Sequence, residues 1–494
     1  MRSKSQSSLL IILITLLLAC SPARQEVAHK KPNVLMIIID DLRPELNCYG
    51  ANHIKSPNID RLSSEGIQFN QAHVQQAICM ASRASILTGV RPEKRGIYTG
   101  ESVTKLLPEV LSINNFFKQE GYNIAAVGKV YHHGEDTQNQ FGNDYIVPTS
   151  SWTGRGYVSQ ESIDKIKLNT THNRGPAYEA ANVHDTLYKD GINTLNAIRK
   201  LDEFQQSDQP FFMAVGLTKP HLPFVAPQKY WDMYPPESID LTDLKERPKN
   251  TSEHTIRFNG ELTNYYGIPA KYTDIDDSTA LILRRAYYAC VSYADAQVGL
   301  LMDKLDQLGI RDETIIVLWG DHGFKLGDYD SWCKWSNMYL DTHIPLIVSA
   351  PKLKRGIINT SPTEAINIYP TLAELAGLKK PNHLEGNSLA PYLNNPSLHQ
   401  EDTIFTIWPH NRWNYDKTIM GFSAKTTRFN YTEWVKLSTG EVVERELYDH
   451  ENDHQETFNV IGDIQYADDI QRMAYQVEKL KANTDHDHAF KNLR

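Results

Sequence analysis

The 494-residue chain contains only five cysteines, and it shows no internal repeat, coiled-coil heptad or low-complexity tract. Disulfide-held scaffolds are far richer in cysteine for their length, so this chain depends on a hydrophobic core instead. The apolar run at residues 9–19 is too short to predict a membrane span. With 40% hydrophobic and 22% charged residues, the composition is typical of a globular protein with one large and one smaller domain.

Positive charge is also in short supply. The formal net charge is -9, whereas proteins that bind nucleic acid carry an extended basic surface. We therefore expect no nucleic-acid partner, although a local basic pocket is compatible with this balance.

The first 20 residues have the pattern of a targeting segment. Arg2 and Lys4 precede the apolar run, which ends in Leu17-Leu18-Ala19-Cys20. This ending resembles a bacterial lipoprotein cleavage box in which Cys20 is lipidated, and plain secretion is the alternative. We expect an exported protein of the periplasm or cell surface, tethered to the membrane by a lipid anchor.

Four apolar segments, 33–39, 124–127, 211–215 and 314–319, have the pattern of strands that are buried on both faces. Helices are expected between them at 57–66, 110–117, 185–204 and 280–308, and a long excursion of loops at 225–275. Strands that alternate with helices form largely parallel sheets, so the sequence predicts an α/β fold.

Polar residues follow each of the four strands. The pairs, in chain order, are Asp40 and Asp41, Lys129 and His132, Lys219 and His221, and Asp321 and His322. Parallel strands end at a common edge, and ligands bind at that edge. Three carboxylates and one histidine suit Ca²⁺ or Mg²⁺, and the basic residues around them suit a tetrahedral oxyanion, sulfate or phosphate.

Residues 78–89 predict a loop that enters a helix of about two turns, with Gly89 as its C-terminal stop. Cys79 would lie at the helix N-terminus, where free N–H groups and the helix dipole favour an anion. Read alone, Cys79 is a buried structural cysteine. Beside the predicted oxyanion pocket it becomes the candidate nucleophile.

The segment Cys79-Met80-Ala81-Ser82-Arg83 resembles the formylglycine-generating motif of type I sulfatases, Cys-x-Pro/Ala-x-Arg. Further matches to this family, in particular to its iduronate-sulfatase branch and the bacterial relatives of that branch, run in the same order from about residue 31 to 450. They are Asp40-Asp41-Leu42-Arg43-Pro44, Cys48-Tyr49-Gly50, Ser56-Pro57-Asn58-Ile59-Asp60, Gly128-Lys129-Val130-Tyr131-His132, Lys219-Pro220-His221-Leu222-Pro223-Phe224, Asp321-His322-Gly323, Lys334-Trp335-Ser336-Asn337, Thr342-His343-Ile344-Pro345-Leu346 and Ile419-Met420-Gly421.

The resemblance implies an alkaline-phosphatase-like sandwich: a large mixed, mostly parallel sheet flanked by helices, plus a smaller C-terminal subdomain with a short antiparallel sheet. It implies that a maturation enzyme oxidises Cys79 to formylglycine, whose hydrated form attacks sulfur. One Ca²⁺ per subunit would be held by Asp40, Asp41, Asp321 and His322, with the residue at position 79 completing the sphere. The remaining implied catalytic residues are Arg83 and His132, which position and deprotonate the nucleophile, and Lys129, His221 and Lys334, which neutralise sulfate and stabilise the leaving group.

The expected division is a signal peptide at 1–20, a catalytic domain at 30–396 and a subdomain at 397–494. In the subdomain, residues 403–407 and 427–435 predict strands, 437–442 a hairpin and 464–482 a helix. Its cluster Trp408, His410, Arg412 and Trp413 is suited to stacking on a sugar ring and pairing with a carboxylate. A surface loop with a half-buried tryptophan is the alternative.

We therefore expect a sulfatase that acts on a sulfated carbohydrate. Uronate 2-O-sulfate, as in glycosaminoglycans, is the first substrate expected, and sulfated rhamnose or fucose, as in algal ulvan, is the second. The alternatives are a phosphoesterase of the same superfamily and a non-catalytic carbohydrate-binding lipoprotein.

Overall fold

A nine-stranded sheet forms the centre of the protein, in a computed structural model that describes residues 31–98, 102–147, 156–395, 398, 403–410 and 418–484. The predicted signal peptide and Cys20 lie outside these residues. From edge to edge the strands are β12 (Ile357–Asn359), β2 (Ile67–His73), β11 (His343–Ser349), β8 (Thr314–Gly320), β1 (Asn33–Ile39), β6 (Phe211–Leu217), β3 (Asn123–Gly128) and β4 (Tyr145–Ile146), and β13 (Thr363–Glu364) also pairs with β2.

The sheet is mixed and mostly parallel, as predicted. Only β11 runs antiparallel to its neighbours β2 and β8, among the strands that the structure describes. The four strands predicted from the sequence, β8, β1, β6 and β3, are consecutive and parallel. They therefore end at the same edge of the sheet, and the polar residues that follow them meet at that edge, as we predicted.

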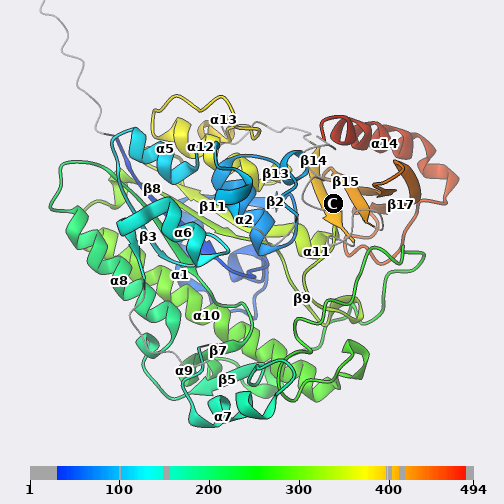
Figure 1. Ribbon diagram of the computed structural model, residues 1–494, viewed down its shortest axis with the longest axis horizontal. Helices are drawn as coiled ribbons and strands as arrows, with labels where there is room; N and C mark the ends of the chain where they lie inside the picture. Colours follow the sequence, from blue (N-terminus) through cyan, green and yellow to red (C-terminus); the bar gives the residue numbers. More distant parts are fainter. Residues whose placement is uncertain are drawn as a thin grey trace, which may run out of the picture. The chain divides into compact units, whose positions relative to one another are not determined.

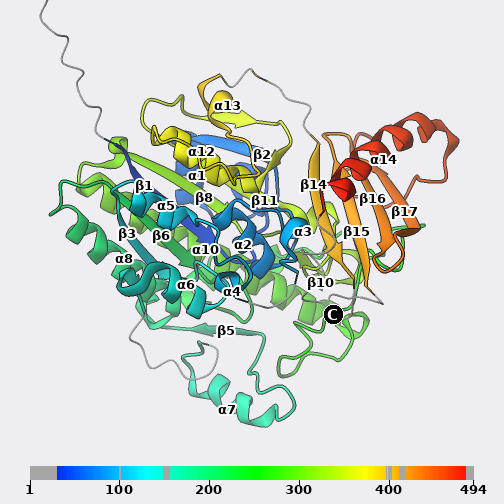
Figure 2. The same cartoon turned by 45° about the horizontal axis from the view of Figure 1, so that its top comes forward.

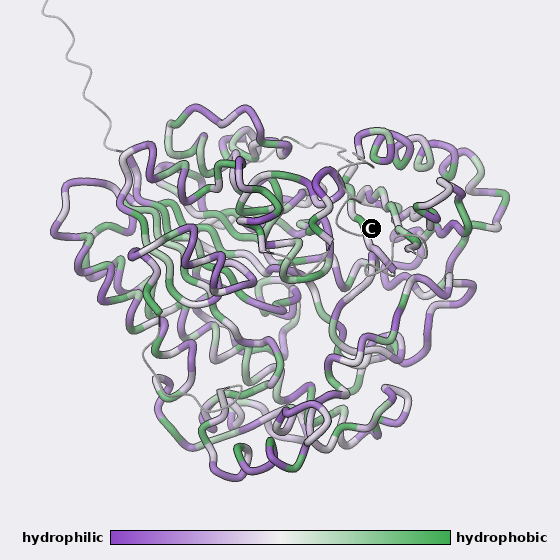
Figure 3. Tube along the Cα trace, in the orientation of Figure 1, coloured by the Kyte–Doolittle hydropathy of each residue, from purple (hydrophilic) through white to green (hydrophobic). Residues whose placement is uncertain are grey.

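Helices cover both faces of this sheet (Figures 1 and 2). Alternate residues of β1 explain why: Leu35, Ile37 and Ile39 belong to one hydrophobic cluster, and Val34, Met36 and Ile38 belong to another. The first cluster includes residues of α1 (Pro57–Glu65), α8 (Lys189–Phe204) and α10 (Asp277–Gln307), and the second those of α2 (Cys79–Thr88), α5 (Ile113–Gln119) and α12 (Ile368–Leu375). Figure 3 shows the central strands as hydrophobic segments between more hydrophilic outer loops.

The C-terminal part of the chain forms an antiparallel sheet of β14 (Ile404–Pro409), β15 (Ile419–Lys425), β16 (Phe429–Lys436) and β17 (Glu441–Asp449). Helix α14 (Ala467–Ala482) packs on it through Met473, Val477 and Leu480. This confirms the predicted short antiparallel sheet, in which β15 is a strand that the sequence patterns did not predict.

Shorter elements complete the described chain. They are α3 (Pro92–Arg95), α4 (Val103–Leu106), α6 (Gly134–Phe141), α7 (Gln160–Leu168), α9 (Gln228–Trp231), α11 (Tyr339–Thr342), α13 (Ala390–Asn394) and the strand pairs β5 (Tyr178–Ala181) with β7 (Phe224–Pro227) and β9 (Lys325–Leu326) with β10 (Trp332–Cys333). None of the described helices combines the length and apolar character needed to span a lipid bilayer. The described cysteines Cys48, Cys79, Cys290 and Cys333 form no disulfide.

The predicted excursion of loops, between β7 and α10, packs against the C-terminal sheet. The Ser252 N–H and the Thr255 hydroxyl both donate hydrogen bonds to the Glu446 carboxylate in β17. These contacts fix the loop to the C-terminal sheet.

Glu456 is a buried carboxylate that joins the C-terminal sheet to helix α11. It accepts hydrogen bonds from the Tyr339 N–H of α11 at 2.8 Å, from Asn430 Nδ2 of β16 at 2.6 Å and from His450 Nε2 at 2.9 Å. Burial alone would raise the pKa of Glu456, but the hydrogen bond from His450, the charge of Lys425 and the Tyr339 N–H lower it to about 2.

We predict that Glu456→Gln lowers the free energy of unfolding at pH 7 by about 2 kcal/mol, because three hydrogen bonds to a charge are weakened. The charged form is stabilised in the folded state, so its contribution is complete above the ordinary pKa of 4.5 and is lost as pH falls toward about 2. The difference between wild type and variant in urea unfolding should therefore shrink below pH 4.5.

The matched control is Glu451→Gln, because Glu451 is exposed and pairs only with Arg428 in the described contacts of its side chain. Its effect should stay within about 0.5 kcal/mol. A Glu456→Gln difference that is independent of pH between 3 and 7 would contradict the assignment.

Candidate active site

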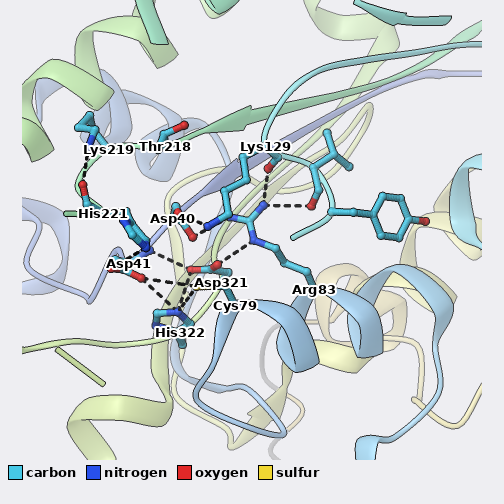
Figure 4. Close-up of polar contacts among 12 residues, drawn as sticks. Asp40, Asp41, Cys79, Arg83, Lys129, Thr218, Lys219, His221, Asp321 and His322 are labelled. Atoms are coloured by element: carbon cyan, nitrogen blue, oxygen red, sulfur yellow. Dashed lines mark hydrogen bonds and ion pairs between the residues drawn. The ribbon is translucent and has the colours of Figure 1, made fainter. Parts of the chain in front are cut away.

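The ends of the four central strands bring their polar residues together (Figure 4). Asp40 and Asp41 follow β1, Lys129 follows β3, His221 lies in the loop after β6, and Asp321 and His322 follow β8. Both aspartates after β1 and both residues after β8 are fully buried. The structure thus gathers charged side chains where an apolar sheet meets its connecting loops.

Asp41 adopts a left-handed backbone with φ of 58°, which is unfavourable for a residue with a side chain. Two hydrogen bonds hold it there. Its N–H donates to Asp321 Oδ1 at 2.9 Å, and its carbonyl accepts from the Tyr287 hydroxyl at 2.8 Å. This turn allows consecutive aspartates to face the same site.

Close backbone approach brings Lys129 to Asp40. A Cβ at Gly216 in β6 would lie 1.9 Å from the Lys129 carbonyl, so only glycine fits there. Lys129 Nζ forms an ion pair with Asp40. Lys219, in contrast, donates from Nζ to the carbonyls of His221 and Pro223, so it holds its own loop and does not contact the carboxylates.

Helix α2 begins at Cys79 and ends at Gly89, whose φ of 71° is the left-handed C-cap that the sequence predicted. Its N-cap residue, Ile78, makes no side-chain cap, so the helix N-terminus faces the site with free N–H groups. Cys79 Sγ lies 3.1 Å from His322 Nε2 and 3.9 Å from Asp41 Oδ1.

Arg83, one turn further along α2, is buried and ties two strand ends together. Its Nε donates to Asp321 Oδ2 at 2.8 Å, and its Nη2 donates to Asp40 Oδ1 at 3.2 Å. Burial alone would raise the pKa of Asp40, but the charges of Lys129, His221 and Arg83 hold it well below its usual range. Asp40 is therefore a carboxylate at every physiological pH.

Apart from the Cys79 thiol, which is a soft ligand, the donors gathered here are carboxylate oxygens and one imidazole, which suit a divalent cation. The ligand atoms of Asp40, Asp41, Cys79 and His322 all lie within 4.8 Å of one another. The Nδ1 of His322 donates to the Gly323 carbonyl at 2.9 Å, which leaves Nε2 to face the cluster, as in metal-binding histidines. Burial opposes protonation of His322, yet Asp321, Cys79 and Asp41 raise its pKa to about 10, so a cation that bound at Nε2 would have to displace a proton.

Asp321, the remaining predicted ligand, lies at the border of this cluster. Its Oδ1 is 3.6 Å from His322 Nε2 and accepts the Asp41 N–H, while its Oδ2 accepts from Arg83. Both oxygens thus already have hydrogen-bond donors, and each keeps a further lone pair for a cation.

A second group of charged and polar side chains, Lys334, Glu261 and His221, lies next to the cluster of possible metal ligands. Lys334 Nζ lies 3.0 and 3.1 Å from the two Asp41 oxygens and 3.0 Å from Glu261 Oε1. His221 Nε2 lies 3.4 Å from the same Glu261 oxygen. Burial would raise the pKa of Glu261, but Lys334 and His221 lower it to about 2. An ammonium group therefore bridges the two carboxylates.

Partial desolvation and the nearby charge of Lys129 lower the pKa of the His132 ring to about 3, which places His132 beside these groups. His132 is exposed, its ring packs on His133, and no hydrogen bond between described residues joins it to Cys79 or Arg83. Trp408 is only 1% exposed and packs against Trp335, so its ring has no free face for a sugar, contrary to the stacking that we predicted. His410 is half-buried against His254, and Arg412 and Trp413 lie outside the described residues.

A cavity of about 350 Å³ opens beside the strand ends. Asp40, Lys129, Thr218, His221 and Leu222 are among its lining residues. Of the carboxylates at the strand ends only Asp40 lines this cavity, beside Lys129 and His221, so the cavity borders one side of the site and has room for part of a small polar ligand.

Comparison with known proteins identifies relatives of the chain. Residues 32–378 match the sulfatase family, and residues 327–483 match the C-terminal region of N-sulphoglucosamine sulphohydrolase. Iduronate 2-sulfatase of Homo sapiens is 32% identical over 88% of this chain and 92% of its own length. A sulfatase of Formosa agariphila is 28% identical over 96% of this chain and 92% of its own length.

A solved structure of a protein in complex with its substrate, D-glucosamine-2-N,6-O-disulfate, superimposes on the chain with a TM-score of 0.69. The two sequences are 20% identical, and the match covers 94% of this chain and 100% of that chain. This likeness confirms the alkaline-phosphatase-like fold that the sequence predicted.

Proposed function

Because the chain belongs to the sulfatase family and is a sulfuric ester hydrolase, we propose that it hydrolyses sulfate esters of carbohydrates through a formylglycine derived from Cys79. The observation that carries this proposal is the place of Cys79. It begins α2, 3.1 Å from His322 Nε2, inside a ring of carboxylates and basic residues. A maturation enzyme would supply the oxidation.

The residues of the site have different roles in this reaction. Arg83 orients the nucleophile through its hold on Asp40 and Asp321. Lys129 and Lys334 place positive charge around the sulfate oxygens and the leaving group, where negative charge develops as the ester bond breaks, and His221 lies beside them as a further polar group. His132, exposed at the mouth of the site, is assigned to proton transfer, and substrate would have to bring the reacting atoms within its reach.

Asp40, Asp41, Asp321, His322 and the modified residue at position 79 would hold one Ca²⁺. Hard oxygen donors with a single nitrogen suit this ion. When bound, it would polarise the sulfate group and balance the buried negative charge.

For the substrate we propose a uronate 2-O-sulfate first, which the similarity to iduronate 2-sulfatase supports. Sulfated rhamnose or fucose is the second candidate. For the setting we propose export to the periplasm or cell surface, with a lipid anchor on Cys20, because residues 1–20 have the pattern of a lipoprotein signal.

We predict that the wild type removes sulfate from a uronate 2-O-sulfated disaccharide in a panel of defined sulfated oligosaccharides. The Cys79→Ala variant should lose at least about 10³-fold in kcat on this substrate, because its nucleophile is removed. Ion chromatography of released sulfate measures both rates. The matched control is Cys290→Ala, a buried cysteine of α10 that belongs to neither group of charges at the strand ends.

The phosphoesterase alternative makes the opposite prediction. If Cys79→Ala keeps its turnover of phosphate esters while the wild type releases no sulfate from any member of the panel, the sulfatase mechanism is wrong. If neither protein acts on any ester, the carbohydrate-binding alternative gains support.

We also predict that removing Ca²⁺ with a chelator abolishes sulfate release and that added Ca²⁺ restores it. At a concentration about 100-fold above Kd, Ca²⁺ should stabilise the wild type by about 2.7 kcal/mol against unfolding. Asp41→Asn should lose this stabilisation. Full activity in excess chelator would contradict the metal assignment.

A further inference from the structure

Glu261 belongs to none of the motifs that predicted the site, yet its loop is built to present it there. Asn259 Oδ1 accepts hydrogen bonds from the Glu261 N–H at 2.9 Å and from the Tyr272 hydroxyl at 2.7 Å. Asn259 Nδ2 donates to the Trp332 carbonyl of β10 at 3.1 Å. The loop is thereby fixed to the segment that carries Lys334.

The Glu261 carboxylate faces two basic residues of the site. Oε1 lies 3.0 Å from Lys334 Nζ and 3.4 Å from His221 Nε2, and the side chain is only 15% exposed. His221 is anchored at its other nitrogen, Nδ1, by the Leu222 carbonyl at 2.6 Å. Hydrogen bonds to a carboxylate in such a setting are strong and directional.

Lys334 requires a partner of this kind. Its other carboxylate, Asp41, belongs to the proposed calcium site, so its charge would be shared with the cation. The residues on both sides of Lys334 are conformationally strained, because Cys333 has φ of 69° and Trp335 has φ of 96°. Such a backbone persists only where contacts hold it, and Glu261 provides one at the ammonium group itself.

We propose that Glu261 is a positioning residue that holds Lys334 and His221 at the oxygen that departs with the carbohydrate. This inference rests on the proposed function, because it assigns Glu261 to the departure of the alcohol from a sulfate ester. Glu261 does not contact the reacting atoms. It fixes where the Lys334 ammonium group and the His221 imidazole meet the negative charge that develops on the departing oxygen.

The test is Glu261→Gln, which keeps the shape of the side chain and removes its charge. The kcat for a sugar sulfate should fall by about tenfold or more, as expected for the loss of hydrogen bonds to a charge, with little change in KM. The kcat for an aryl sulfate should fall less, because a phenolate leaves without much assistance. A merely structural role would lower both rates equally.

A double-mutant cycle with Lys334→Met supplies the second readout. If Glu261 acts through Lys334, its substitution should lower kcat on the sugar sulfate far less in the Lys334→Met protein than in the wild type. If the wild type hydrolyses only the sugar sulfate, the two esters cannot be compared, and the double-mutant cycle is then the test of the role of Glu261. Glu261→Asp, which keeps the charge, serves if Glu261→Gln does not fold, and it should lower kcat by a smaller factor.

The matched control is Glu246→Gln, since Glu246 is an exposed glutamate of the same loop excursion. It should leave both rates unchanged. Equal losses on both esters, or additive effects in the cycle, would overturn the role of Glu261. A wild type that hydrolyses no sulfate ester would instead overturn the proposed function, so the two failures are distinguishable.

Discussion

The structure depends on the balance of buried charge at one edge of the central sheet. Asp40, Asp41 and Asp321 are wholly buried, and isolated carboxylates in such a place would be costly. Arg83, Lys129 and Lys334 offset this cost by pairing with them directly. The close glycine contacts, the left-handed turn at Asp41 and the start of α2 at Cys79 all serve to bring these charges together.

The sequence predicted the centre of the fold well, for a physical reason. Strands β1, β3, β6 and β8 are buried on both faces, so their apolar runs are continuous and easy to identify. Strand β2, with the sequence Ile-Gln-Phe-Asn-Gln-Ala-His, mixes polar and apolar residues and was missed. The antiparallel β11 contains a proline and follows a helix of only one turn, which breaks the expected alternation of strand and helix. Helix α8 begins at Lys189 and not at residue 185, because Asp185–Leu187 form a 3₁₀ turn.

The site was predictable where its residues follow strands, and less so where they come from loops. Asp40, Asp41, Asp321 and His322 share one edge because parallel strands do. Glu261 could not be found in this way, since it lies in an irregular segment that contacts such as those of Asn259 and Arg174 hold in place. Trp408 was misjudged because its aromatic neighbours suggested a surface cluster, whereas β14 packs it against Trp335. Loop composition alone does not specify which side chains turn inward.

The chemistry proposed for this protein centres on position 79, so the mass of the peptide that contains it is the most direct measurement. We predict that protein purified from its native host, and active in releasing sulfate from a carbohydrate ester, carries formylglycine at position 79. Mass spectrometry after an aldehyde-specific label would show this modification there and not at Cys48, Cys290 or Cys333. An unmodified Cys79 thiol throughout a fully active preparation would contradict the mechanism.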